Sequence, residues 1–177
     1  MLRERFPWAT ALPVAGAVLL LDQATKAWVL REMPGAPPLT IIPGFFDVTF
    51  SRNTGGVFGL FAGPPGPARR ILFAAATAVA LTALALLLRR WGRESRLALV
   101  ALSLVAGGAV GNLIDRLRFG SVVDFIDWYW GAHHWYTFNV ADAAITSGAA
   151  LLLLHSFLPE RHGAGRDGQP APTLPEA

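Results

Sequence analysis

The stretch that decides the fold of this chain is GNLIDRLRFGSVVDFIDWYWGAHHWYTFNVAD, residues 111–142. It joins two strongly apolar segments, and yet it holds a concentration of charged side chains. Only 15% of the 177 residues are charged and 53% are hydrophobic, whereas a soluble domain carries about 25% charged residues. The composition indicates a membrane protein that gathers carboxylates in this stretch. The Asp and Arg residues are Asp115, Arg116, Arg118, Asp124, Asp127 and Asp142.

Four apolar segments are expected to cross the membrane as helices. Ile71 to Leu88 contains 18 residues without a charge between two arginine pairs, close to the roughly 20 apolar residues that span a bilayer. The next segment contains Ser103, Gly107 and Gly111 at intervals of four, a small-residue face suited to close helix packing. We therefore predict an all-α membrane protein with four transmembrane helices in one domain, residues 1–158. The expected spans are residues 8–30, 70–88, 97–117 and 136–158.

Two connecting segments are expected to lie at one membrane face. Residues 34–68 are rich in Pro and Gly, which interrupt long helices. Within them, Phe46, Val48 and Phe50 alternate with polar residues, and this period of two predicts a short strand in a small β-element. The aromatic residues 125–136 are expected to form a loop or short helix at the membrane interface. The polar tail, residues 159–177, is expected to be disordered and cytoplasmic.

The alternation of four spans brings the ionisable residues of the helices to one face. Asp22 and Lys26 lie near the end of the first span, and Asp142 lies at the start of the last. Residues 89–96 contain four arginines, and the positive-inside rule places them and both termini in the cytoplasm. Arg69 and Arg70, at the other end of the second span, argue for the opposite orientation. We favour the dense arginine loop, so the carboxylates are expected to face the periplasm of a bacterial inner membrane.

Several classes of function are disfavoured by composition and motifs. The chain has no cysteine, which excludes thiolate chemistry. Its net charge of +3 is not arranged as a basic stripe with aromatic residues, so no nucleic-acid partner is expected. Ser121 and Ser147 lack a nucleophile elbow, and the adjacent His133 and His134 lack the HExxH spacing. No cofactor is expected, although oxygen ligands could in principle hold magnesium. That alternative site would consist of Asp115, Asp124 and Asp142.

The charged residues near the ends of the spans suggest structural and binding functions. Asp22 and Lys26 are four apart and share a helix face, so we expect them to form an ion pair. Asn112, Asp115 and Arg116 also share a face. We expect Asp115 to give structural support, and Arg116 to hold either a carboxylate or a substrate carbonyl.

Asp124 and Asp142 are the candidate catalytic residues. Each is a single carboxylate among apolar or small neighbours, the surroundings in which a carboxyl pKa is raised. The residues alone leave alternatives open: Asp142 could merely cap the last helix, and Asp124 could mark a turn. Asp127 is a competing candidate in an aromatic stretch. A small transporter or proton-relay protein could use Asp22, Asp115 and Asp142, although the apolar cytoplasmic halves of the spans argue against a path across the membrane. An assembly or scaffold subunit would need no pair of isolated carboxylates.

The set of motifs resembles the lipoprotein signal peptidase (signal peptidase II) family. The resemblance covers residues 8 to about 158, and five motifs in this order are specific although each alone is weak. The family often has alanines where this chain has Gly56-Val57, so the fit around the substrate is expected to differ. The motifs are Asp22-x-x-x-Lys26, Asn53-Thr-Gly-Gly-Val-Phe-Gly59, Gly111-Asn-Leu-Ile-Asp-Arg116, Val122-Val-Asp-Phe-Ile126 and Phe138-Asn-Val-Ala-Asp142.

The resemblance implies an aspartic endopeptidase of the bacterial inner membrane with Asp124 and Asp142 in the catalytic positions. It implies diacylglyceryl-modified prolipoproteins as substrates, cut just before the lipidated cysteine, and membrane lipids as surroundings. The protein is expected to act as a monomer, without a metal. The resemblance places Asn53, Asn112, Arg116 and Asn139 along the site, and gives Asp22 and Lys26 a supporting function.

Overall fold

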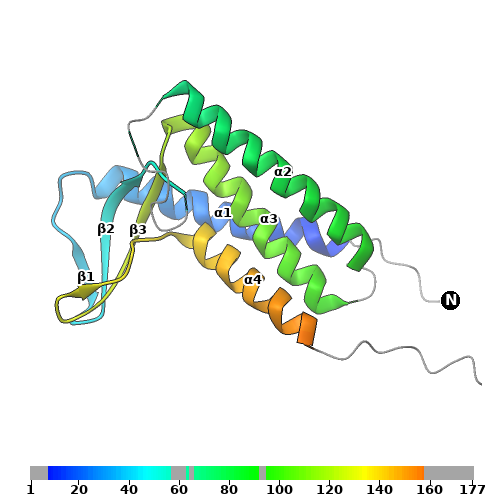
Figure 1. The fold of residues 1–177 in the computed structure, drawn as a ribbon. Helices are drawn as coiled ribbons and strands as arrows, with labels where there is room; N and C mark the ends of the chain where they lie inside the picture. Colours follow the sequence, from blue (N-terminus) through cyan, green and yellow to red (C-terminus); the bar gives the residue numbers. More distant parts are fainter. Residues whose placement is uncertain (1–7, 57–62, 64–65, 92–94, 158–177) are drawn as a thin grey trace, which may run out of the picture.

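A bundle of helices and a small antiparallel sheet at one end of it make up the described part of the chain (Figure 1). The computed structural model describes residues 8–56, 63, 66–91 and 95–157. The predicted C-terminal tail lies outside these residues, as does part of the Asn53–Gly59 motif. The helices are α1 (Trp8–Glu32), α2 (Pro67–Trp91), α3 (Arg96–Phe119) and α4 (Val140–Phe157). The strands are β1 (Leu39–Ile42), β2 (Phe46–Asn53), β3 (Val122–Trp130) and β4 (His133–His134).

The helices alternate in direction, so that α1 and α3 end beside the sheet while α2 and α4 start there (Figure 1). Three of the described helices, α2, α3 and α4, are long and apolar enough to cross a membrane. The outer faces of the bundle expose large apolar side chains, among them Leu20, Ile71, Val79 and Leu153. Such surfaces are suited to lipid. The fourth crossing, through α1, remains a proposal, although its 25 residues would rise about 38 Å.

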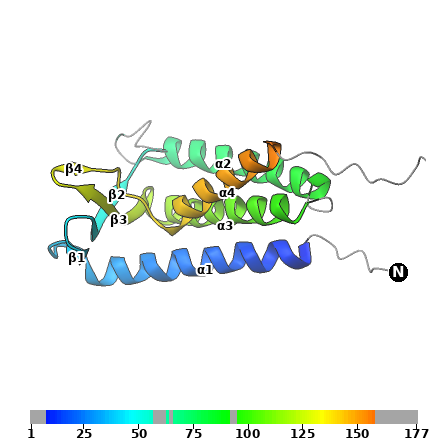
Figure 2. The same cartoon turned by 90° about the horizontal axis from the view of Figure 1, so that it is seen from below.

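Helix α3 packs against α1, α2 and α4 and forms the centre of the bundle (Figure 2). Two glycines explain this close packing: Gly107, which belongs to the predicted small-residue face, and Gly108, which does not. A Cβ atom at Gly107 would lie 2.6 Å from the carbonyl oxygen of Ala15 in α1. At Gly108 a Cβ would collide with the backbone of Ala141 in α4. Glycine at these positions lets both neighbouring helices approach the backbone of α3.

The strand predicted around residues 46–51 is β2, but the sheet is larger than expected. Its order is β1-β2-β3-β4, and β2 pairs with β3 in antiparallel register, with Ser51 opposite Asp124. The prediction of an aromatic loop or short helix over residues 125–136 was wrong, since most of this stretch forms β3 and β4. Valine, isoleucine and aromatic residues favour strands when a partner strand is present. The description of the fold as all-α is therefore corrected to mostly helical with a four-stranded sheet.

The last helix begins later than predicted, at Val140 rather than near residue 136. Residues before it continue toward the sheet, where the backbone of Phe138 pairs with that of Ile126. Asn139 directly precedes α4. Because only this residue separates the paired Phe138 from the helix, the first turn of α4 lies next to β3.

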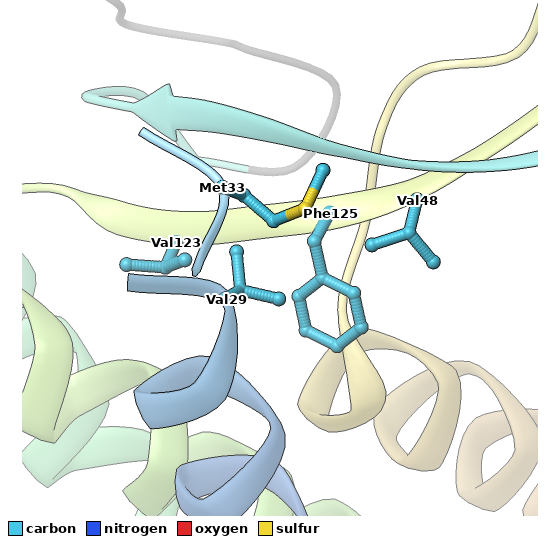
Figure 3. Close-up of a cluster of buried hydrophobic side chains, with 5 residues drawn as sticks. All are labelled: Val29, Met33, Val48, Val123 and Phe125. Atoms are coloured by element: carbon cyan, nitrogen blue, oxygen red, sulfur yellow. The ribbon is translucent and has the colours of Figure 1, made fainter. Parts of the chain in front are cut away.

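A cluster of buried apolar side chains fastens the sheet to the end of α1 (Figure 3). Val29 and Met33 come from α1 and the residue after it, Val48 from β2, and Val123 and Phe125 from β3. Burying side chains of this size stabilises by about 1.5–3 kcal/mol each. Because Val123 and Phe125 flank Asp124 in the strand, the cluster fixes the position of that carboxylate.

Candidate active site

Asp124 and Asp142, the two predicted catalytic residues, meet through a single asparagine. The side chain of Asn139 donates from Nδ2 to Oδ1 of Asp124 at 2.6 Å, and its backbone N–H donates to Oδ2 of Asp142 at 3.3 Å. Asp124 is buried, with 1% of its surface exposed. The charges of the two carboxyl groups interact. The structure therefore brings together residues from β3 and α4 that are far apart in sequence.

The start of α4 holds Asp142 by helix capping. Oδ1 of Asn139 accepts the backbone N–H of Asp142 at 2.9 Å, and this bond and the Asn139 N–H bond to Asp142 form a reciprocal capping box. The N–H group of Ala141, also in the first turn of α4, donates to Oδ1 of Asp22 at 3.0 Å. Negative side chains are favourable at a helix N-terminus. Asp142 thus caps the helix and also lies in the site, whereas Asp124 lies in a strand and not in a turn.

Lys26 and Asn112 connect α1 with the Asp142 carboxylate. The Lys26 ammonium donates to Asp22 Oδ2, Asp115 Oδ2 and Asn112 Oδ1, each at 3.0 Å. An ammonium has three donors and no acceptor, so it fixes the oxygen of the Asn112 amide toward itself. The other end of that amide, Nδ2, then donates to Oδ1 of Asp142 at 2.7 Å. The predicted Asp22–Lys26 ion pair is present, inside a larger buried network.

Asp115 supports the strand that carries Asp124. Its Oδ2 accepts the backbone N–H of Val123 at 3.0 Å. Its Oδ1 accepts Nε2 of Gln23 at 3.2 Å, and the same Gln23 amide lies 3.1 Å from Asp22 Oδ2. Through these contacts Asp115 links α3 to β3 and to Gln23 in α1.

Asn53 approaches the site from the end of β2, and Arg116 approaches it from α3. The Asn53 side chain hydrogen-bonds to the Asp124 carboxylate. Arg116 donates from Nη2 to the carbonyl oxygen of Gly55 at 3.1 Å, and its guanidinium lies 4.7 Å from the ring centre of Phe73. In this structure Arg116 therefore binds a peptide carbonyl of its own chain.

The surroundings of Asp124 favour its protonated form. Burial, with the negative charge of Asp142 as a second cause, raises the pKa of the Asp124 carboxyl from 3.8 to about 7. Hydrogen bonds from Asn139 and Asn53 and the positive charge of Lys26 lower this pKa and offset part of the effect. Two neighbouring carboxyl groups in such a place share a proton near neutral pH, which is the state that acid–base catalysis by a carboxyl pair needs.

Comparison with known proteins identifies the family of the chain. The family model described as signal peptidase (SPase) II matches residues 14–158. The chain belongs to the signal peptidase II family. The match spans α1 to α4 and includes every predicted site residue.

Individual lipoprotein signal peptidases are similar to this chain over most of its length. The lipoprotein signal peptidase of Geobacter metallireducens is 46% identical over 148 residues, 84% of this chain and 90% of the relative. That of Desulforapulum autotrophicum is 43% identical over 142 residues, 80% of this chain and 88% of the relative. A solved bacterial membrane enzyme, 32% identical, superposes with a TM-score of 0.76 over 84% of this chain and 87% of its own. Family membership makes the chain a peptidase of a bacterial membrane.

Other candidate residues lie away from the carboxyl pair of this signal peptidase. Asp127 is an odd number of residues from Asp124 in the same strand, so the two side chains point to opposite faces, and Asp127 contacts His134 at 2.9 Å. His155 lies against Trp91, at the ends of α4 and α2 that are remote from the sheet. Within the described residues, no three acidic or histidine side chains are grouped to hold a metal ion.

Two contributors to the site were missed by reasoning from sequence. Gln23 bridges Asp22 and Asp115, and the only local signal for it was its place next to Asp22. Gly111 was predicted as a packing residue, but it also makes room for the network, because a Cβ there would lie 2.5 Å from Oδ2 of Asp22. Neither contact has a signature in the local sequence pattern.

Proposed function

We propose that this protein removes signal peptides from prolipoproteins as an aspartic endopeptidase, with Asp124 and Asp142 as the catalytic residues. The observation that carries the proposal is the Asn139 bridge, which hydrogen-bonds to both carboxylates at the sheet end of the helix bundle. The lipoprotein signal peptidases to which the chain is similar support this class of substrate. The substrate is a diacylglyceryl-modified prolipoprotein, cut just before its lipidated cysteine.

The proposed mechanism uses one ionised and one protonated carboxyl group. The ionised group takes a proton from a water molecule between the pair, and the water oxygen attacks the scissile carbonyl carbon. The protonated group gives its proton to the carbonyl oxygen. When the tetrahedral intermediate collapses, the C–N bond breaks and the leaving amine takes a proton from the pair. The two groups titrate as a unit, so the starting proton belongs to the pair.

The neighbouring residues keep the pair in this arrangement. Asn53, Asn112 and Asn139 donate to the carboxylates and limit where each can move. Lys26, Asp22 and Asp115 hold Asn112 and β3 in place. Arg116 holds the carbonyl oxygen of Gly55, two residues after Asn53. The acyl chains of the substrate lie against the apolar outer faces of the helices, so the bilayer helps to position the cysteine.

We place the site at the periplasmic side of the inner membrane, with both termini cytoplasmic, and treat α1 as a fourth crossing. Arg89, Arg90 and Arg96 lie at the helix ends remote from the sheet, and clustered arginines favour the cytoplasm. The alternative of a transporter is not favoured, because Asp22 and Asp115 are held by Lys26 at the sheet end of the bundle and do not form a path across it.

The test is cleavage of a diacylated prolipoprotein peptide by the full chain in lipid nanodiscs. Asp124→Asn and Asp142→Asn are each expected to lower kcat at least about 1,000-fold, because each removes a proton-transfer group. Asp127→Asn, in the same strand but on its other face, is the matched control and is expected to cut like the wild type. Turnover by either active-site variant would remove that residue from the mechanism.

A chelator distinguishes the metal alternative. The proposed mechanism uses only side chains and water, so EDTA is expected to leave the rate of cleavage unchanged. A loss of activity that magnesium restores would instead favour a metal site involving Asp115, Asp124 and Asp142.

A further inference from the structure

Arg69 stands in a place that neither helix formation nor membrane orientation explains. It lies in the first turn of α2, which contains no acidic residue, and a positive charge there opposes the helix macrodipole. It also lies at the sheet end of the bundle, opposite the arginines that set the proposed orientation. A residue that is unfavourable on both counts is expected to serve another purpose.

That purpose is visible in its contacts with the loop after β2. Arg69 donates from Nη2 to the carbonyl oxygen of Thr54 at 3.0 Å, and its guanidinium lies so close to Gly63 that a Cβ there would collide with it. The following carbonyl, that of Gly55, accepts Nη2 of Arg116 at 3.1 Å. Two guanidinium groups, one from α2 and one from α3, therefore hold consecutive peptide carbonyls.

The turn held in this way includes Asn53, which contacts Asp124. Oδ1 of Asn53 accepts the backbone N–H of Gly55 at 2.8 Å, and Nδ2 lies 3.4 Å from the carbonyl oxygen of Gly56. The Asn53 amide is thus bonded both to the turn and to the Asp124 carboxylate. A change in the backbone at Thr54 or Gly55 would move the amide that donates to the carboxyl pair.

We propose that Arg69 is a positioning residue that fixes the Thr54–Gly55 backbone together with Arg116 and so holds the Asn53 amide against Asp124. This inference rests on the proposed function, because it assigns Asp124 to catalysis. The adjacent Arg70 provides the contrast. Its side chain is exposed and lies against Gly120, the C-cap of α3.

The experiment compares Arg69→Met with Arg70→Met in nanodiscs, using the diacylated peptide. Arg69→Met keeps an unbranched side chain but removes the donors, and we expect kcat to fall about 10- to 100-fold with a smaller change in KM. Arg70→Met is expected to retain wild-type kcat. Arg69→Lys, which keeps a charge and a donor, is expected to recover part of the loss; should Arg69→Met fail to fold, Arg69→Lys and Arg70→Lys make the same comparison.

Two further readouts separate positioning from a general loss of structure. If Arg69 acts through Asn53, the effects of Arg69→Met and Asn53→Ala are not additive, and the double variant is expected to lose less than threefold beyond Asn53→Ala. Losing the Asn53 bond also shifts the pH–rate profile of the carboxyl pair to higher pH, since that bond lowers the pKa of Asp124. The other charged groups acting on Asp124, namely Asp142, Lys26 and Arg116, are unchanged in this comparison.

Wild-type kcat in Arg69→Met, an equal loss in Arg70→Met, or additive effects with Asn53→Ala would overturn the inference. Each of these results leaves the peptidase function standing as long as Asp124→Asn is inactive. Cleavage by Asp124→Asn would instead refute the proposed mechanism itself.

Discussion

Replacing Lys26, the chain's single lysine, with methionine tests the buried network most directly. Lys26 is 2% exposed and its ammonium bonds to Asp22 and Asp115, which are 0% and 1% exposed. Methionine has a similar length and an apolar end, so it fills the space without supplying a donor. The substitution changes the formal charge of these three side chains from −1 to −2.

The expected cost follows from leaving charged groups buried without a partner. Removing one member of a buried ion pair destabilises proteins by about 3–5 kcal/mol. Asn112 also loses one of the two donors to its amide oxygen and keeps only Asn139 Nδ2 at 3.3 Å, so its own bond to Asp142 Oδ1 is held less firmly. We therefore expect Lys26→Met to lose about 3–5 kcal/mol of unfolding free energy and most of its kcat.

The measurement is unfolding of the full chain in detergent, followed by tryptophan fluorescence. Arg31→Gln is the matched control in the same helix, because it breaks the Arg31–Glu32 pair, whose side chains are 77% and 47% exposed. An exposed pair contributes at most about 1 kcal/mol. The double variant Lys26→Met with Asp115→Asn removes one of the buried negative charges, and it is expected to regain part of the lost stability.

Two results would refute this reasoning. If Lys26→Met unfolds within about 1 kcal/mol of the wild type, the charges do not depend on the ammonium. If the double variant is less stable than Lys26→Met, the loss comes from packing and not from charge.

Two other predictions concern the same site. Gly111→Ala places a Cβ 2.5 Å from the Asp22 carboxylate, so it is expected to lower both stability and activity. Gly16→Ala is the control, because a Cβ at Gly16 meets open space. Equal melting temperatures of the two variants would contradict the close approach of Gly111 to Asp22. The pKa of Asp124 is raised to about 7 in the folded state, whereas the unfolded state loses this proton near pH 4. The contribution of Asp124 to the free energy of unfolding therefore falls as the pH rises from about 4 to about 7. The difference in unfolding free energy between Asp124→Asn and the wild type is therefore expected to shift in favour of the variant when the pH is raised from 5 to 8. The same difference at both pH values would count against the raised pKa of Asp124.

The helices could be predicted because their signals are local. The uncharged run Ile71–Leu88 lies within α2, and the spacing of Asp22 and Lys26 predicted their ion pair. The alternating residues Phe46, Val48 and Phe50 likewise predicted β2. Each of these signals depends only on the period of a helix or strand.

The second half of the sheet could not be predicted in this way. In β3 the aspartates at 124 and 127 lie three positions apart, so charged residues do not recur with the period of two that marks a strand. Its partner β2 is remote in sequence, and strand preference depends on the partner. The Lys26–Asn112 and Gln23–Asp115 bonds are also long-range contacts. The proximity of Asp124 and Asp142 was predicted from the alternation of spans and from the family resemblance. In the structure Asn139 hydrogen-bonds to both carboxyl groups.

The contact between Asp22 and the N-terminus of α4 has a consequence for biosynthesis. Asp22 Oδ1 accepts the N–H of Ala141, 119 residues later in the chain, so the arrangement around Asp142 needs both the first and the last helix. On the proposed mechanism, a nascent chain still on the ribosome has no complete catalytic centre until its final helix has emerged and docked. Unfinished copies are therefore expected to be inactive.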